Sequence, residues 1–460
     1  MNAKTVDQKT LFQIAWPIFC DLSLRILTGS INILMIGRIS TMYVAAMTVG
    51  NQIFSLSIVI FNFIGIGLTV AIAQMLGAGD HKSIRKVIHC AYGFNCICGL
   101  AVVILINVFG HNILNIMQIQ EDIHDDAHTY LTVLAISLFP EALSICTASI
   151  LRAHGYTKEA MYSSLAANLL TICSNTLLLF GFFGLPQLGI EGAAISIIVG
   201  RIGALAVLAY FFRHRISIRL HFKFLFAFKS YYLKRILRVG MPAAGENLAW
   251  NLQFMTATAF IASLGNYELA TNTFYYQVIC MYMMLFSVSL GMATEIIVAY
   301  HIGARNYEIA YHRLMKSLGS GFMGSFLIAL IMACGLSELV LGIFSKHSSE
   351  VLEMAAPLIL LSVFMEPGRA FNVIVINSLR AANDTNFPMI MAIISMWGIA
   401  VPLEYFLGIK LGYGLLGIWI AFACDEWIRG ISMFIRWRSK VWIEKSEKRR
   451  LKDKKVLSQL

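Results

Sequence analysis

Long apolar runs separated by short polar connections make up most of this chain of 460 residues. One run, from Ile39 to Gly79, contains no charged side chain at all. A stretch of about 18 or more predominantly apolar residues is long enough to cross a bilayer as a helix. The runs therefore predict an all-α integral membrane protein with twelve transmembrane helices, near 12–37, 44–74, 88–110, 128–151, 160–183, 190–212, 240–264, 270–300, 315–340, 353–379, 388–409 and 414–437.

The charged residues gather in the connections, and their sign alternates from one connection to the next. Stretches such as "GAGDHKSIRK" and "GARNYEIAYHRLMK" are basic, whereas "QEDIHDD" on the opposite side is acidic. Cytoplasmic loops carry an excess of Lys and Arg, so we expect both termini and the basic segment 213–239 to be cytoplasmic. The net charge of +11 is thus an orientation signal and does not indicate a nucleic-acid partner.

Composition agrees with a multi-pass protein of the cell (inner) membrane. Hydrophobic residues make up 58% of the chain and charged residues only 13%, about half the usual share in soluble domains. The partners expected from composition are therefore membrane lipids. Nothing in the sequence demands a protein partner, and we expect a monomer.

Several local patterns occur twice at almost the same spacing. "WPIFCD" in the first span matches "MPAAGE" in the seventh, so that Pro17 pairs with Pro242 and Asp21 with Glu246, both 225 residues apart. "LRAHGYT" after the fourth span matches "LRAANDT" after the tenth, and "GIEGAAIS" matches "GLLGIWIA". Generic turn residues explain any one match but not the shared register, so the repeat indicates a duplication.

The duplication predicts a division of the chain into two homologous lobes. The expected parts are an N-lobe at 1–212 with helices 1–6, a linker at 213–239, a C-lobe at 240–437 with helices 7–12, and a basic tail at 438–460. Because each lobe contains an even number of spans, both have the same orientation. This is the parallel repeat found in some secondary transporters.

Polar side chains interrupt the apolar spans, beginning with the first. Asp21, Arg25, Thr28 and Asn32 fall at i, i+4, i+7 and i+11, which places them within about 60° of one another on a helix. A charge at the centre of a bilayer costs about 2.5–3.5 kcal/mol even on lenient scales. This stripe therefore faces protein or water, and Glu141 in the fourth span adds a further buried charge.

The C-lobe has corresponding polar positions in its seventh and tenth spans. They are Glu246, Asn251, Gln253, Glu366, Arg369 and Asn377. Two interpretations remain open for Asp21–Arg25 and for Glu366–Arg369: a functional charge, or a static ion pair that holds helices together. Glu246 has no basic neighbour within a helical turn, so we expect it to exchange protons.

Three other acids receive a different interpretation. Glu295, Asp425 and Glu426 lie near the ends of their predicted spans, and we expect them to be interfacial rather than functional.

The chain lacks the motifs of a motor or a hydrolase. It contains no GxxxxGK[ST], HExxH or GxSxG sequence and no His/Cys cluster at metal-ligand spacing. We therefore expect no enzymatic activity, no cofactor and no resident metal. A transporter without a nucleotide site must be driven by an ion gradient.

The order and spacing of these motifs resemble the multidrug and toxic compound extrusion (MATE) family over essentially the whole chain. The matching stretches are "SINILMIGRIS", "GAGD", "GMPAAGENLAWN", "GARN", "EPGRAFN…LRAANDT" and "DEWIRG…RWRSKVW". The resemblance implies a V-shaped protein with a central cavity that antiports organic cations or amphipathic drugs against H+ or Na+ by alternating access. The alternatives are a flippase of lipid-linked precursors or polysaccharides from the same superfamily, and a membrane enzyme.

The resemblance also implies roles for individual residues. Family members usually have an aspartate in the first-span motif, where this chain has Asn32, which cannot titrate. We therefore expect Glu366 and Glu246 to bind the coupling ion, with Asp21 secondary. The residues expected to contact substrate or line the cavity are Asn32, Arg25, Thr28, Asn251, Gln253, Arg369, Asn377 and Glu141.

Overall fold

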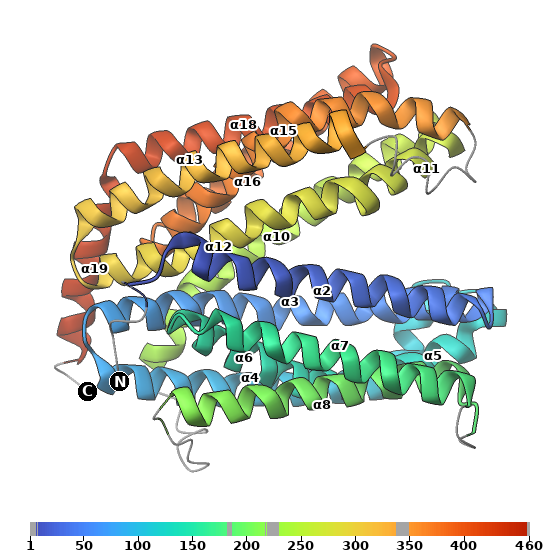
Figure 1. The fold of residues 1–460 in the computed structure, drawn as a ribbon, viewed down its shortest axis with the longest axis horizontal. Coiled ribbons are helices and arrows are strands. Elements are labelled where there is room, and N and C mark those ends of the chain that lie inside the picture. The colour runs from blue at the N-terminus through green and yellow to red at the C-terminus, as the bar shows by residue number, and fades with distance from the viewer. Residues whose placement is uncertain are drawn as a thin grey trace. The chain divides into compact units, whose positions relative to one another are not determined.

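The computed structural model describes residues 6, 8–181, 186–216, 218, 230–336 and 349–457, and all secondary structure in these ranges is helical (Figure 1). The chain divides into two compact units. Unit 1 comprises Met1–Lys9 and Trp16–Met241, and unit 2 comprises Thr10–Ala15 and Pro242–Leu460. Residues 217 and 219–229 of the predicted linker at 213–239 lie outside the described residues, and its last part, from Ser230, already belongs to a helix.

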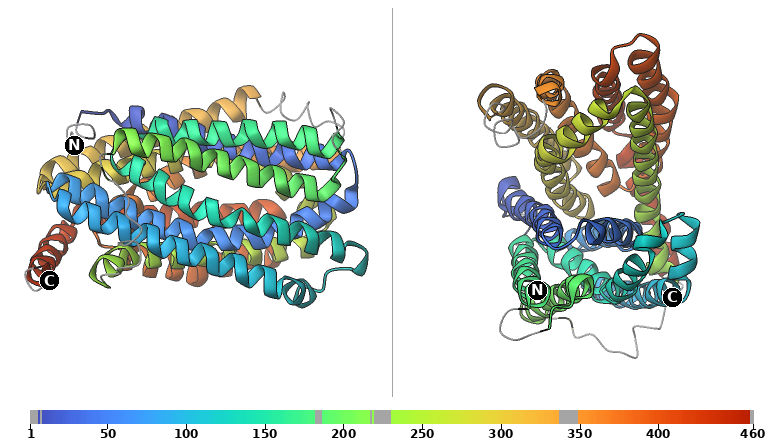
Figure 2. Two further views of the ribbon diagram at one scale, coloured as in Figure 1. Left: turned by 90° about the horizontal axis from the view of Figure 1, so that it is seen from below. Right: turned by 90° about the vertical axis from the view of Figure 1, so that its right-hand side faces the viewer.

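Unit 1 is a bundle of long helices that lie side by side (Figures 1 and 2). Its helices are α2 (Leu11–Gly37), α3 (Thr41–Gly77), α4 (His81–Ile116), α5 (Glu121–Ile136), α6 (Leu138–Ala153), α7 (Thr157–Phe180) and α8 (Gly189–Arg215). Helix α7 packs along α8, and α3 packs against both α5 and α6. An apolar cluster drawn from several of these helices fills the interior of the unit.

Unit 2 is a second bundle with the same order of helices. Its elements are α10 (Ser230–Leu264), α11 (Asn266–Phe274), η2 (Tyr275–Cys280), α12 (Met281–Gly303), α13 (Tyr307–Ile331), η3 (Met332–Leu336), α15 (Ser349–Ala381), α16 (Asn386–Ser395), η4 (Met396–Ala400), α17 (Val401–Glu404), η5 (Tyr405–Lys410), α18 (Gly414–Arg438) and α19 (Val441–Leu457). The η segments are π-helical turns within longer helices. Helix α15 packs along α12, α13 and α18.

Within the described residues, each of the twelve predicted spans falls on a helix or a chain of abutting helices. The ends of two predicted spans, 182–183 and 337–340, lie outside the described residues. The fourth span is bent by 42° between α5 and α6. Pro140 lies at the start of α6; its ring lacks an N–H and clashes with the carbonyl four residues earlier, which accounts for the break at Ser137.

Within the described residues, eight helices are long and apolar enough to cross a membrane, or nine with the bent α5–α6 pair counted as one span. Helices α7, α10 and α18 fall short of that test. Helix α18, for example, carries Asp425, Glu426 and Arg429 in its middle, and all three side chains are buried. Large apolar side chains such as Leu34, Met255 and Ile435 are instead exposed by 62% or more. Apolar surface outside and charge inside is the arrangement expected of a multi-pass membrane protein.

The first part of α10, as far as Met241, belongs to unit 1, where it lies close to α3. A Cβ atom on Gly67 would collide with the carbonyl oxygen of Ile236, and one on Gly240 would collide with the carbonyl oxygen of Phe63. Each helix thus places a glycine against the backbone of the other. Small residues at such crossings allow transmembrane helices to pack backbone to backbone.

The predicted basic tail contains helix α19, which docks on the turn between α15 and α16. Asp384 in that turn accepts hydrogen bonds from Arg436 Nε at 2.8 Å and from Lys445 Nζ at 2.6 Å. Ser446 Oγ donates to the carbonyl oxygen of Ala382 at 2.8 Å. The tail is therefore a fixed part of unit 2 as far as Leu457.

Candidate functional site

Five buried or half-buried charges in unit 1 form a chain of alternating sign, which we call the first ladder. Asp21 pairs with Arg152 at 2.5 Å and with Arg25 at 3.2 Å. Arg25 reaches Glu141 at 3.3 Å, and Glu141 pairs in turn with Arg201 at 3.1 Å. The order from one end to the other is Arg152, Asp21, Arg25, Glu141, Arg201.

Four helices hold the first ladder in place: α2, α6, α7 and α8, the last of which carries Arg201. The i, i+4 spacing on α2 puts Asp21 and Arg25 on one face, while α6 supplies Glu141 in its first turn and Arg152 in its last. Ser164 Oγ on α7 donates a further hydrogen bond to Asp21. Both carboxylates are almost fully buried, so these arginines supply the counter-charges that a buried carboxylate requires.

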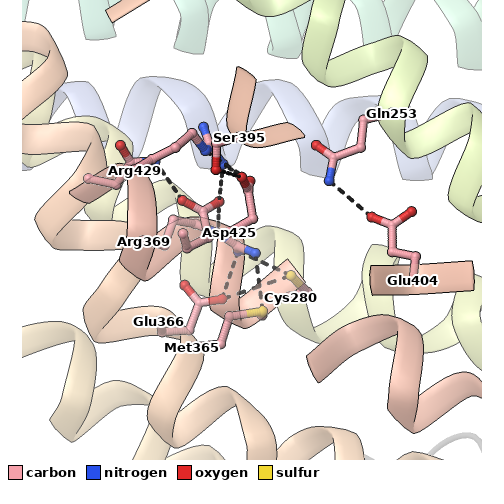
Figure 3. A network of polar contacts seen from close by, with 11 residues as sticks. Gln253, Cys280, Met365, Glu366, Arg369, Ser395, Glu404, Asp425 and Arg429 are labelled. Atoms are coloured by element: carbon pink, nitrogen blue, oxygen red, sulfur yellow. Dashed lines mark hydrogen bonds and ion pairs between the residues drawn. The ribbon is translucent and has the colours of Figure 1, made fainter. Parts of the chain in front are cut away.

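A second ladder occupies the interior of unit 2 (Figure 3). Glu366 pairs with Arg369 at 2.7 Å, and Arg369 Nε lies 3.4 Å from Glu426. Glu426 lies 3.3 Å from Arg429, which also binds Asp425 at 2.7 Å. These five side chains come from α15 and α18 and are all buried.

Neutral groups complete the second ladder, with one exception. Ser395 Oγ donates to Asp425 at 2.6 Å, and Asn372 Nδ2 donates to Glu426 at 2.7 Å. Cys280, on the π-helical turn η2, lies 3.2 Å from the Arg369 guanidinium. By contrast, Oε2 of Glu366 is buried without a hydrogen-bond partner among the described residues.

Glu246 is paired, contrary to the expectation that it stands alone. No basic residue lies within a turn on its own helix, but Arg380 at the end of α15 reaches it at 2.7 Å. Asp21 and Arg152 form the same contact in unit 1, and both pairs belong to the repeated sequence motifs. The charges of Arg429 and Glu246 also interact. Glu366 lies 14 residues before Arg380, about 21 Å along the helix, so Glu366 and Glu246 belong to two different sites.

The two ladders differ in their balance of charge. The first contains two carboxylates and three guanidiniums. The second contains three carboxylates and two guanidiniums. A small cation or a proton would therefore find a surplus negative charge in unit 2 and none in the first ladder.

The difference arises from an ion pair whose signs are exchanged between the repeats. Glu141 lies 11 residues before Arg152, and Arg369 lies 11 residues before Arg380. Their partners on α8 and α18, residues 201 and 426, are 225 residues apart, which is the offset of the repeat. The pair is Glu–Arg in unit 1 and Arg–Glu in unit 2.

The other predicted polar positions make separate contacts. Asn32 accepts a hydrogen bond from Asn175 Nδ2 at 3.2 Å. Thr28 and Asn251 donate to carbonyl oxygens of their own helices, at 2.9 and 2.8 Å, as polar side chains without a partner do. Asn377 Nδ2 likewise donates to its own helix, and its Oδ1 accepts from Arg380 at 3.4 Å. Gln253 donates to Glu404, a residue that the sequence did not single out.

The expectation that Glu295, Asp425 and Glu426 lie near the ends of their helices is wrong for Asp425 and Glu426. Asp425 and Glu426 lie midway along α18 and are 1% and 6% exposed, and Glu295 on α12 is 3% exposed. The predicted span 414–437 already places Asp425 and Glu426 near its middle, so their central position could have been recognised from the sequence. The sequence also did not assign Arg152 and Arg380 to a site, although both stand in the repeated "LRA" motif.

The described residues contain no group of three or more His, Cys, Asp or Glu side chains placed to hold a metal ion. The role of Glu366 or Glu246 in transient Na+ binding therefore stays a prediction.

Comparison with known proteins identifies the family. The MatE family profile matches residues 17–177 and again 242–406. The chain belongs to the MATE family. The two matches begin 225 residues apart, at 17 and 242, which confirms the predicted duplication.

Relatives of this MATE transporter cover nearly its full length. It is 39% identical over 436 residues to an uncharacterized transporter, YisQ of Bacillus subtilis (strain 168), which covers 95% of each chain. It is 25% identical over 449 residues to a probable multidrug resistance protein, NorM of Thermotoga maritima, covering 95% of this chain and 93% of the relative.

Solved structures share the fold. The outward-facing conformation of a multidrug resistance MATE family transporter superposes with a TM-score of 0.87 at 18% identity, covering 96% of this chain and 98% of the other. The predicted all-α fold with two homologous six-helix halves is confirmed.

Proposed function

We propose that this MATE transporter is a secondary active antiporter that exports organic cations or amphipathic drugs in exchange for H+ or Na+. The observation that carries the proposal is the surplus carboxylate of the second ladder. Glu366 is fully buried, shares Arg369 with Glu426, and has one oxygen without a hydrogen-bond partner among the described residues. Such an oxygen is a natural acceptor for a proton or a small cation.

Uptake of the ion at Glu366 would redistribute the contacts of Arg369. With Glu366 neutral, the guanidinium is attracted chiefly to Glu426 on α18, so the contact between α15 and α18 changes. An ion that binds one arrangement better than the other shifts the equilibrium between the two, and a substrate with the opposite preference shifts it back. Glu246 and Asp21, each held by an arginine from the "LRA" motif, are secondary ion-binding candidates.

The names of relatives and the pairing of the arginines support a cationic substrate. Several relatives are described as probable multidrug resistance proteins. A flippase for polyanionic head groups is expected to line its cavity with several unpaired arginines or lysines, whereas Arg25, Arg201 and Arg369 each contact a carboxylate. We further propose cytoplasmic termini, from the basic connections, and a monomer as the working form.

The test is ethidium efflux from proteoliposomes with imposed Na+ or H+ gradients applied separately. Wild type is compared with Glu366→Gln, Glu246→Gln and a control, Glu308→Gln, which changes an exposed acid in the same unit. We expect efflux with one of the two gradients, its loss of at least about tenfold in Glu366→Gln, and no change in the control.

Two results would contradict the proposal. Efflux that persists unchanged in Glu366→Gln would remove the second ladder from coupling. If folded wild type shows no efflux with either gradient while a lipid-scrambling assay is positive, the flippase alternative would replace the antiporter.

A further inference from the structure

A second polar contact in unit 2 lies apart from the ladders. Glu404 is the last residue of α17 and is completely buried. It accepts a hydrogen bond from Nε2 of Gln253, a buried side chain of α10, at 3.0 Å. Figure 3 shows the two side chains pointing toward each other beside the second ladder.

Each of the two side chains leaves one oxygen atom unused. Oε2 of Glu404 and Oε1 of Gln253 are both buried and have no hydrogen-bond partner within the described residues. A buried acceptor without a donor is costly, at about 1–3 kcal/mol. Two such acceptors on one interacting pair indicate that a donor shared between them is missing.

The charges around Glu404 do not supply that donor. No ion pair joins Glu404 to a basic side chain in the part of the chain that the structure describes. The ionisable group that faces it from α18 is Asp425, which is itself acidic and bound to Arg429 and Ser395. On the α10 side, the facing group is the neutral amide of Gln253.

We propose that Glu404 and Gln253 form a proton-binding site, distinct from Glu366, that exchanges its proton during transport. Protonation forms one O–H bond at Oε2 of Glu404 and breaks one O–H bond of a hydronium ion, which leaves as water. That O–H donates to Oε1 of Gln253, while Nε2–H continues to donate to Oε1 of Glu404. The result is a reciprocal acid–amide pair in which each unused oxygen has its partner.

A metal ion fits the same place poorly. Hard cations take about six or more oxygen ligands, whereas this pair has three side-chain oxygens, of which two are unused. The described residues also contain no group of three or more His, Cys, Asp or Glu side chains placed to hold a metal ion. A proton needs only one donor atom and one acceptor atom. The chemistry of the pair therefore selects H+ over Na+.

The backbone around Glu404 is unusual in a way that suits a moving part. Helix α17 is only four residues long and lies between two π-helical turns, η4 and η5. Single π-helical turns occur frequently at functional sites because they insert a residue into the helical register. A change in the Glu404–Gln253 contact would be transmitted to α10, which also carries Glu246.

The inference deepens the proposed antiport by adding a second ion-binding group, and it is tested by a measurement that does not require transport. Infrared difference spectra of the purified protein, recorded between mildly acidic and mildly alkaline buffer, report protonated carboxyl groups directly. We expect the pH-dependent carboxyl signal to lose one component in Glu404→Gln. The control Glu308→Gln should keep the component assigned to Glu404.

A second variant keeps the carboxyl and removes its partner. In Gln253→Leu the same component should remain but shift to higher wavenumber, because the protonated carboxyl has lost both hydrogen bonds to the amide. This variant also decides the matter if Glu404→Gln fails to fold.

The result that would overturn the inference is a carboxyl signal that is identical in wild type, Glu404→Gln and Gln253→Leu. This outcome is independent of the efflux assay. The Glu404 signal can be present when efflux fails, and efflux can occur when the Glu404 signal is absent. If both hold, H+-driven efflux in Glu404→Gln should fall at least about tenfold.

Discussion

The exchanged ion pair predicts that the member whose replacement destabilises the protein more has opposite charge in the two units. It is the glutamate in unit 1 and the arginine in unit 2. In unit 1, Glu141→Gln leaves Arg201 without its carboxylate, whereas Arg201→Met leaves Glu141 still paired with Arg25. In unit 2, Arg369→Met leaves Glu366 without its guanidinium. The variant Glu426→Gln leaves no arginine alone, because Arg369 keeps Glu366 and Arg429 keeps Asp425.

The size of the effect follows from distance and burial. Two charges at the 3.1 Å of Arg201 and Glu141 attract by about 5 kcal/mol at an effective dielectric constant of about 20. Removing one member of a buried pair costs about 3–5 kcal/mol, because the other charge stays buried alone. The Glu366 side chain is fully buried, so Arg369→Met should lower the free energy of unfolding by about 3–5 kcal/mol. The Arg201 side chain is 23% exposed, so water screens it and Glu141→Gln should cost about 2–3 kcal/mol.

The complementary substitutions should cost much less. Replacing a charged member by a neutral residue of similar volume is often tolerated when its partner retains another counter-charge. We therefore expect about 0–2 kcal/mol for Arg201→Met and for Glu426→Gln. The predicted order of destabilisation is Arg369→Met first, Glu141→Gln second, and the other two last.

Thermal unfolding of the purified protein in one detergent, followed by tryptophan fluorescence, measures this order. The conservative variant Arg369→Lys serves as a control, because a single ammonium cannot reproduce the fork that reaches Glu366 through Nη1 and Glu426 through Nε. It should recover only part of the loss. The deficit of Arg369→Met should shrink in acidic buffer, because a carboxyl without its guanidinium loses its charge by taking up a proton.

The reasoning is refuted if the same sign of residue is the sensitive one in both units. If Arg201→Met destabilises more than Glu141→Gln, the pairs behave as isolated contacts and not as parts of a ladder. Equal costs for Arg369→Met and Glu426→Gln would carry the same meaning for unit 2.

Three further outcomes follow from other contacts. Asp384→Asn weakens the anchor of α19, so limited proteolysis should release the tail several-fold faster than in wild type, and equal rates would contradict the docking described above. Gly67→Ala should lower the unfolding midpoint by pressing a methyl group on the carbonyl of Ile236, whereas Gly29→Ala, where a Cβ meets nothing within 4 Å, should raise stability by up to about 1 kcal/mol. Asn32→Asp should fold normally, because the Asn175 amide that donates to Asn32 can also donate to a carboxylate. The variant should add a pH-dependent step to efflux. Efflux with an unchanged pH profile would exclude position 32 from coupling.

The fold was largely predictable because its signal is long and repeated. Apolar runs of membrane-spanning length appear in the sequence twelve times, and the duplication fixed how they group. The bend at Ser137 and the π-helical turns were not predictable, since both interrupt helices whose hydropathy is continuous across the break. A single Pro140 gives a warning of the first, but nothing in the composition of residues 396–410 distinguishes π from α turns.

The site was predictable in its residue types but not in its pairings. The stripe on α2 correctly placed Asp21 and Arg25 in the protein interior. Their partners Glu141 and Arg152 come from α6, more than 100 residues away. The sequence shows no basic residue within one helical turn of Glu246. Its partner Arg380 lies on another helix, 134 residues later, so the sequence did not reveal this ion pair. Contacts between helices depend on which faces meet, and hydropathy does not record this.

The exchanged pair explains why the duplication hid part of the site. The attraction between two opposite charges is unchanged when their signs are swapped, so Glu–Arg on α6 and α8 and Arg–Glu on α15 and α18 hold the same two helices together equally well. When the two repeats are aligned, Glu141 and Arg201 in unit 1 differ from Arg369 and Glu426 in unit 2, although the ion pair is present in both. The exchange does affect the neighbouring side chains, because positive and negative charges must continue to alternate along each ladder. A glutamate at the inner position requires arginines on both sides, which leaves unit 1 with an extra positive charge. An arginine there requires carboxylates on both sides, and the outer carboxylate in unit 2 is Glu366, whose Oε2 has no hydrogen-bond partner among the described residues. The same exchange of signs that preserves the packing of the helices thus provides unit 2, and not the first ladder, with the negative charge that cation binding needs.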